Sequence, residues 1–242
     1  MPMQQRSILI PGLAALVAFA ILIGLGTWQL ARLHWKEALI ATVQQRVAEP
    51  PAALPPLAEW KNLDLSEWEY RPVTLKGRFW YDREAYVYTL LSDPKGKLEG
   101  PGYWVMTPLQ IDGGGNVIVN RGFIPLDHPE MKVAQTNGEV EIRGLLRGPE
   151  ERNMFTPDDF PAKSLFYARD AAAISAGMSF DAAPFTIDAL ETPPGGLPQA
   201  GETRMSFPNR HWEYALTWYG LAASLVAVMA GLLWSRRRRA AS

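Results

Sequence analysis

Two long apolar runs, one near each end of the chain, constrain its fold most strongly. Residues 8–30 and residues 215–234 contain no charged side chain. As helices that rise about 1.5 Å per residue, they would be about 35 and 30 Å long, which is enough to cross the hydrocarbon core of a bilayer. The residues between the runs are polar and interrupted by proline and glycine. The sequence therefore predicts two transmembrane helices that flank one extramembrane domain.

The charges beside the two runs predict how the chain is oriented. Residues 236–239 are four arginines that follow the second run almost at once, and such a cluster marks the cytoplasmic side of a membrane. Arg32 and Lys36 follow the first run on the opposite side, but the larger cluster outweighs them. We expect the following segments: a cytoplasmic arm (1–7), a first membrane helix (8–30), a periplasmic domain (31–210), a second membrane helix with its interfacial start (211–234) and a cytoplasmic basic tail (235–242).

The first run is predicted to be a retained anchor and not a signal peptide. The apolar core of a signal peptide is about 7–15 residues long and ends at a cleavage site made of small residues. This run is longer, and residues 27–32 read TWQLAR, which is a poor cleavage region. The residues before the run are too few for a mitochondrial transit peptide, so we expect a multi-pass protein of a bacterial cytoplasmic (inner) membrane.

Composition excludes several classes of function. The net charge is −1, so the extramembrane domain lacks the basic surface that nucleic-acid binding requires. The chain has no cysteine, which excludes thiol-based copper transport, Cys-x-x-Cys redox chemistry and covalent attachment of c-type haem. Without disulfides the domain depends on an apolar core, for which about 170 residues suffice.

The segment between the runs predicts a β-rich domain. Runs that alternate in polarity, or are rich in Tyr and Val, end at turns such as the Gly-rich residues 112–116. The expected strands are residues 71–80, 85–91, 103–111, 117–120, 139–146 and 185–190. Residues 34–47 should continue the first helix into water, and residues 168–177 should form a short helix. We therefore predict a membrane protein of the α+β class, with an antiparallel barrel or sandwich, one or more short helices and an open strand order.

Known catalytic patterns are missing from the sequence. It has no Gly-x-Ser-x-Gly elbow, no His-Glu-x-x-His pair, no phosphate loop and no dinucleotide fingerprint. The three histidines are His34, His128 and His211, too few for a protein zinc site. We interpret His128 as a surface loop residue. A membrane-tethered enzyme is thus the least favoured class, and we expect no enzymatic activity.

His211 is the one histidine whose position indicates chemistry. It lies just before the second apolar run, and on a helix it shares a face with Tyr214 and Trp218. An imidazole above two large rings could hold a flat amphipathic cofactor and bind haem iron axially, while Arg210 could pair with a propionate. The alternative is an interfacial belt of aromatic side chains, which any membrane protein can have.

The first helix offers further candidates where it leaves the membrane. Trp28, Gln29 and Arg32 share one face there, and Arg32 could contact a propionate or a partner protein. The alternative is a charge that extends to the membrane interface. Small residues predict that the two membrane helices pack closely as an antiparallel pair. These small residues are Ala20, Gly24, Gly220, Ser224, Ala227 and Gly231.

Several blocks of sequence together resemble one known family. They read LGTWQLAR at 25–32, GPGYWVMTPL at 100–109, VNRGFIP at 119–125, NMFTP at 153–157, YARD at 167–170 and PNRHWEYALTWYGLA at 208–222. In this order, over nearly the whole chain, they resemble the Surfeit locus protein family of cytochrome c oxidase assembly factors. The two-helix topology is also that of the family.

The resemblance implies a non-enzymatic factor that binds haem a transiently and helps to deliver it to the nascent oxidase subunit. It implies that the histidine of the last block, His211, is the axial ligand of the haem iron. It also implies two kinds of partner, the catalytic subunit of cytochrome c oxidase and the machinery of haem a biosynthesis. The alternative is a scaffold that holds the assembling subunit through the periplasmic domain and binds no haem.

Overall fold

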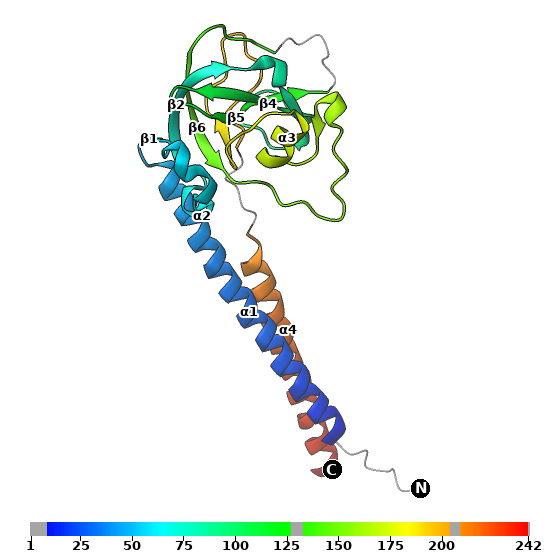
Figure 1. Cartoon of the computed structure of the whole chain (residues 1–242). Coiled ribbons are helices and arrows are strands. Elements are labelled where there is room, and N and C mark those ends of the chain that lie inside the picture. Colours follow the sequence, from blue (N-terminus) through cyan, green and yellow to red (C-terminus); the bar gives the residue numbers. More distant parts are fainter. Residues whose placement is uncertain (1–8, 127–132, 204–208, 242) are drawn as a thin grey trace. The chain divides into compact units, whose positions relative to one another are not determined.

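The chain divides into two compact units, a helical one and a β-rich one. The structure, a computed structural model, describes residues 9–126, 133–203 and 209–241. The helical unit consists of α1 (Leu9–Val47) as far as Thr42, together with α4 (His211–Ala241). The β-rich unit begins at Val43 and contains every strand of the described residues (Figure 1).

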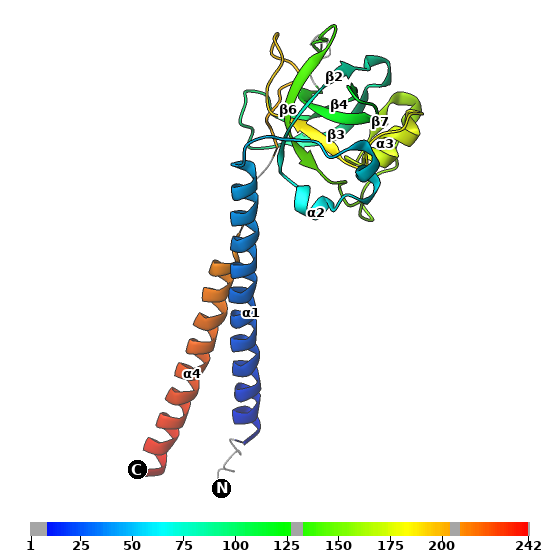
Figure 2. The same cartoon turned by 60° about the vertical axis from the view of Figure 1, so that its left-hand side comes forward.

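Both predicted membrane segments are helical. Within the described residues, two helices are long and apolar enough to cross a membrane, Ile10–Val47 and His211–Arg238. In both views α1 and α4 run side by side in opposite directions, so that α1 begins at the end of the pair where α4 finishes (Figures 1 and 2). The predicted continuation of the first helix over residues 34–47 is confirmed.

The helices meet at small residues other than the predicted ones. A Cβ atom added at Gly24, Gly220 or Gly231 would meet nothing within 4 Å, so the prediction that these glycines line the contact is wrong. Ala20, Ser224 and Ala227 are likewise exposed. The buried small residues are Gly26, Ala215 and Ala222. The contact thus involves the middle of α1 and the first half of α4.

Five strands of the β-rich unit close into a barrel. Around it run β2 (Pro72–Phe79), β6 (Val140–Arg147), β8 (Thr186–Ala189), β5 (Asn116–Pro125) and β4 (Gly100–Ile111), and β4 pairs back with β2. Four of these junctions are antiparallel and β5–β8 is parallel. The predicted α+β class and β-rich domain are therefore confirmed, with one parallel junction in the barrel.

Smaller elements extend and cover this barrel. β3 (Ala85–Leu91) continues the sheet beyond β4, while β1 (Ala52–Ala53) and β7 (Leu165–Phe166) add short parallel edges to β2 and β3. The short helices are η1 (Leu57–Asn62), α2 (Leu65–Trp68), η2 (Tyr81–Arg83), η3 (Pro161–Lys163) and α3 (Ala171–Gly177). α3 begins later than predicted because the Asp170 carboxylate caps the amides of Ala172 and Ala173.

β5 is buried on both faces and separates two apolar cores. Val117 and Val119 point into the core inside the barrel, which all five barrel strands share. Ile118 points outward into a second core, where Met106 and Ile174 of α3 also pack. A strand covered on both sides reads as a continuous apolar run, because both of its faces leave water. This accounts for the uninterrupted apolar sequence at 117–119.

Two glycines of the sequence blocks are required by close backbone approach. A Cβ atom at Gly102 would lie 2.2 Å from the carbonyl oxygen of Ile124 on the neighbouring strand. Gly122 has φ of 131° and a Cβ there would lie 2.4 Å from the backbone of Gln199. Both positions exclude any side chain, so these glycines determine the fold.

Candidate functional site

His211 is held by a residue of the other helix. Its Nδ1 atom lies 2.7 Å from Oε1 of Gln29 on α1, and the imidazole is half-buried. At the start of α4 the side chain of Asn209 accepts a hydrogen bond from the backbone N–H of His211, at 3.4 Å. The two helices thereby fix the position of the ring. Sequence reasoning placed Gln29 beside Trp28 and Arg32 but did not identify it as the partner of His211.

The hydrogen bond to Gln29 selects one form of the imidazole. A carbonyl oxygen only accepts, so the 2.7 Å contact requires a proton on Nδ1 of His211. In the neutral ring the proton-free atom is then Nε2, which keeps its lone pair. Histidines that bind metals usually donate their other N–H to such an oxygen, because this fixes the tautomer and the ring orientation. The geometry therefore makes Nε2 of His211 a competent metal ligand.

The other predicted residues of α4 occupy different environments. Trp218 is half-buried, and its indole Nε1 is buried with no hydrogen-bond partner among the described residues. Tyr214 lies at the edge of the face and is exposed, as is Arg210. A buried N–H without an acceptor costs stability, so Trp218 presents an unused donor on the face that carries His211.

The candidates on α1 are exposed. Trp28 is more than half exposed, and the guanidinium of Arg32 lies 4.3 Å from the ring centre of Trp35 one turn further along the helix. The α1 residue that hydrogen-bonds to His211 is Gln29, which follows Trp28 directly in the sequence. Arg32 is therefore held by its own helix through a cation–π contact.

A second contact between the helices lies about two turns further along α4 than the histidine. Oγ1 of Thr27 is 3.2 Å from the hydroxyl oxygen of Tyr219. A Cβ atom at Gly26 would lie 2.8 Å from the ring of Tyr219, so this glycine makes room for the ring. The stretch Gly26-Thr27-Trp28-Gln29 therefore supplies three successive features of the site: space, a hydroxyl and the acceptor for His211.

His211 cannot by itself hold a bare metal ion. Among the residues that the structure describes, no three His, Cys, Asp or Glu side chains gather as a metal site. A haem brings four pyrrole nitrogens to its own iron and needs from the protein only an axial ligand, an apolar surface and partners for its polar groups. The proton-free Nε2 of His211 and the unpaired indole N–H of Trp218 are compatible with that requirement.

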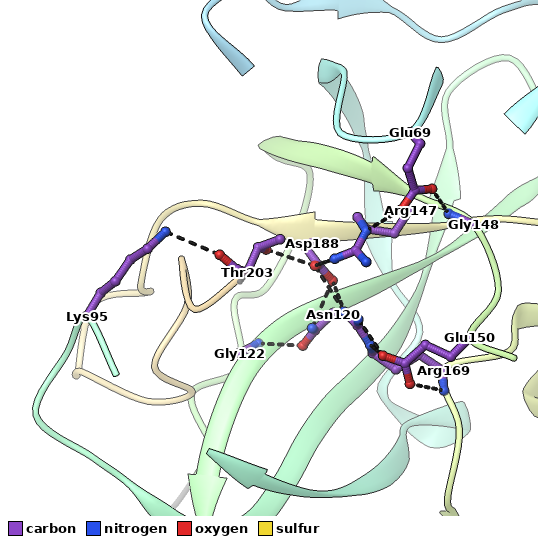
Figure 3. A network of polar contacts seen from close by, with 10 residues as sticks. All are labelled: Glu69, Lys95, Asn120, Gly122, Arg147, Gly148, Glu150, Arg169, Asp188 and Thr203. Carbon is purple, nitrogen blue, oxygen red and sulfur yellow. Dashed lines mark hydrogen bonds and ion pairs between the residues drawn. The ribbon is translucent and has the colours of Figure 1, made fainter. Parts of the chain in front are cut away.

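The β-rich unit contains a network of buried charges (Figure 3). The carboxylate of Asp188 on β8 accepts hydrogen bonds from Asn120, Arg147, Arg169 and Thr203. Arg169 in turn donates to Glu150 at 2.6 and 2.8 Å, and Arg147 donates to Glu69 at 2.8 Å. A cavity of about 260 Å³ lies beside the network.

The buried charges of this network compensate one another, which indicates that it stabilises the fold and does not take part in catalysis. Burial raises the pKa of the Asp188 carboxyl, but the positive charges of Arg169 and Arg147 outweigh burial and lower it. The carboxylate is therefore ionised, with both oxygens engaged, and is unsuited to accept a proton as a general base. Asn120 and Arg169, which belong to two of the sequence blocks, hold strands and loops together here. Arg121 of the same block as Asn120 forms a buried ion pair with Glu84 at 3.0 Å.

Other histidines and acidic residues of the sequence lie away from this site or outside the described residues. His34 is exposed on α1, and His128 lies outside the described residues. Asp159 forms an ion pair with Arg152 at 2.8 Å.

Comparisons with known proteins identify relatives along most of the chain. A profile of the SURF1 family matches residues 16–223. Surfeit locus protein 1 of Rattus norvegicus is 38% identical over 229 residues, which cover 88% of this chain and 71% of the relative. The protein of that name from Homo sapiens is 38% identical over 219 residues (83% and 70%), and a SURF1-like protein of Drosophila melanogaster is 34% identical over 231 residues (88% and 73%). The profile match includes both Gln29 and His211.

Proposed function

The chain belongs to the SURF1 family, and we propose that it binds haem a through His211 and helps to deliver it to the nascent catalytic subunit of cytochrome c oxidase. The family implies a general role in cytochrome oxidase assembly. The haem step is our proposal, as are the two partners, the catalytic subunit and the machinery that makes haem a. In this role the protein is a non-enzymatic, membrane-embedded carrier.

The contact between His211 and Gln29 carries the proposal. It leaves Nε2 of His211 proton-free and places the ring between two helices that are long enough to span a membrane. Trp218 would lie against the haem and offer its indole N–H to a polar group of the cofactor. The exposed residues Tyr214 and Arg210 would cover an edge of the haem and pair with a propionate. Bound haem a would supply an iron centre destined for the oxidase.

Residues of α1 would complete the site from the other helix. Trp28 is exposed beside Gln29 and offers a large apolar surface. Arg32 would reach a propionate only by leaving its contact with Trp35, so we assign it a secondary role. The cofactor would be held transiently, because most of these side chains remain open to the surroundings.

We further propose that the protein lies in a bacterial inner membrane with the β-rich unit in the periplasm and both termini in the cytoplasm. The arginines at 236–239 support this orientation. A periplasm-active reporter fused after Ser242 should be silent, whereas one inserted near Gly195 should be active. The reverse pattern would refute the orientation.

The decisive experiment compares haem content and the Soret spectrum of four proteins purified alike from cells that make haem a. They are the wild type, His211→Ala, Arg210→Ala and His34→Ala. We expect His211→Ala to lose bound haem a, Arg210→Ala to bind more weakly with an unchanged axial ligand, and His34→Ala to resemble the wild type. Acid should release haem from the wild type, because protons compete with iron for a neutral imidazole.

The fold should survive these substitutions. His211→Ala removes one hydrogen bond, worth about 0.5–1.5 kcal/mol, at a half-buried position outside the barrel. Circular dichroism and melting behaviour should therefore change little. A His211→Ala protein with full haem content and an unshifted spectrum would leave only the scaffold function, in which the periplasmic domain holds the assembling subunit and no haem is bound. Loss confined to His34→Ala would place the ligand on α1 and not on α4.

A further inference from the structure

An exposed apolar loop of the β-rich unit remains unexplained by haem binding. Met154 and Phe155 are 90% and 85% exposed, more than any other large apolar side chain described in this unit. They belong to the block NMFTP at 153–157. Two adjacent large apolar side chains that project into water are costly, and such features mark interaction sites.

The loop is ordered in a way that keeps these side chains outward. The amide of Phe155 donates to Oδ1 of Asn153 at 2.9 Å, and the amide of Thr156 donates to the carbonyl oxygen of Asn153 at 3.0 Å. Arg152 closes the base of the loop by pairing with Asp159 at 2.8 Å. The loop therefore presents a preformed apolar tip, so that binding would require little further ordering.

The base of the loop joins an exposed band of aromatic rings. Asp159 accepts a hydrogen bond from the backbone N–H of Tyr167 at 2.9 Å. The Tyr167 ring lies 6.4 Å from that of Phe160 and 5.9 Å from that of Tyr88 on β3. Phe160 and Tyr88 are both exposed. The tip and this band are linked through the contacts of Asp159 with Arg152 and Tyr167. We call the two together the aromatic surface, and it is rich in the side chains that dominate protein interfaces.

The charges beside the apolar tip distinguish two possible binding partners of the aromatic surface, an anionic lipid membrane and a protein. Glu151 and Asp158 are exposed carboxylates on the two sides of the apolar tip, and Arg152 between them is already paired with Asp159. An anionic lipid surface would repel this loop, since apolar segments that enter bilayers are typically flanked by Lys and Arg. A protein with an apolar pocket rimmed by Lys or Arg would complement it.

We propose that the aromatic surface docks a partner protein by inserting Met154 and Phe155 into an apolar pocket with a basic rim. The exposed rings of Phe160 and Tyr88 would pack beside the pocket, and Glu151 and Asp158 would face its basic side chains. This docking is independent of haem ligation, because none of these residues belongs to the site at His211.

The absence of cysteine from the chain allows a specific test. Phe155→Cys in the full-length protein would carry the only thiol, to which a benzophenone maleimide is attached in isolated native membranes. The matched control is Ala172→Cys, an exposed position on α3. Irradiation should give one protein adduct from position 155 that position 172 does not give, and mass spectrometry should map it to apolar residues flanked by Lys or Arg.

Charge reversal then tests the complementarity itself. Glu151→Lys combined with Asp158→Lys should reduce the adduct yield by about fivefold or more, with unchanged thermal unfolding of the protein. A yield unaffected by charge reversal, an adduct with lipid, an adduct with a second copy of this chain, or equal yields at both positions would each overturn the proposal. Adding His211→Ala should leave the adduct unchanged, so failure of docking and failure of haem binding are distinguishable.

Discussion

Replacement of Asp188 by asparagine should destabilise the β-rich unit severely. The Asp188 side chain is 3% exposed and its carboxylate pairs with both Arg169 and Arg147. Asp188→Asn keeps the shape but removes the negative charge that these two buried guanidinium groups share. Breaking a buried ion pair by removing one partner costs about 3–5 kcal/mol, because the remaining charge stays buried without compensation. Glu150 and Glu69 still neutralise part of that charge, so we expect the lower end of this range.

Urea unfolding of the full-length protein in detergent measures this loss, with tryptophan fluorescence as the signal. Trp60 lies in the barrel core and should report its opening. The matched control is Glu141→Gln, which removes an exposed ion pair with Lys76 at 3.3 Å and should cost about 0–1 kcal/mol. A loss of less than 1 kcal/mol for Asp188→Asn would show that the network contributes little to the fold.

The pH dependence of this effect has a definite sign. Burial raises the pKa of Asp188, but Arg169 and Arg147 outweigh it, so the folded-state pKa lies below the unfolded value of about 3.9. Asp188 therefore contributes stability that is fully present above about pH 4 and is lost as the pH falls through the folded pKa. The difference in unfolding free energy between wild type and Asp188→Asn should be constant at neutral pH and shrink in strong acid.

Three further predictions concern the helices and the barrel. Gln29→Leu should weaken haem a binding by about 10–100-fold in a spectroscopic titration, because it frees the His211 ring without removing the ligand; unchanged affinity would exclude the orienting role. Gly26→Ala should reduce haem content, because a Cβ atom at Gly26 would lie 2.8 Å from the ring of Tyr219 on α4. Gly24→Ala should not, because a Cβ atom there would meet nothing within 4 Å. Equal effects of the two substitutions would argue against the contact between Gly26 and Tyr219. Burial and the neighbouring Glu84 raise the pKa of Tyr86 to about 12. The contribution of Tyr86 to the unfolding free energy should therefore fall as the pH rises from about 10 towards 12. Tyr86→Phe should remove this contribution to the loss of stability at alkaline pH.

Local patterns predicted the helices and most strands well. The apolar runs gave both long helices, and the Tyr- and Val-rich residues 85–91 coincide with β3. The predicted strand at 117–120 was too short, because β5 continues to Pro125 through Asn120 and Arg121, whose polar side chains are buried by partners from distant segments. Closure of the barrel through the parallel β5–β8 junction depends on such distant pairings, which periodicity cannot reveal.

The candidate site was predictable on one helix only. The position of His211 before an apolar run identified it, but its partner Gln29 lies 182 residues away in the sequence. The burial of Asp188 in an ion pair could have been predicted from the sequence. A carboxylate within the largely apolar residues 185–190 must have a buried partner. Which arginines serve as that partner depends on the fold, since Arg147 and Arg169 come from a strand and a loop that only the tertiary structure brings together.

The structure divides the sequence blocks into two groups with different physical roles. Gly102, Asn120 and Arg169 are explained by folding, because each is buried or admits no side chain. Phe155 and His211 are not explained in this way: one is almost fully exposed, and the other is a half-buried imidazole that hydrogen-bonds to Gln29 through Nδ1 and not through Nε2. Folding alone would favour replacing Phe155 with a polar residue. These two positions lie in separate units, so the haem site and the docking surface can be tested, and can fail, independently.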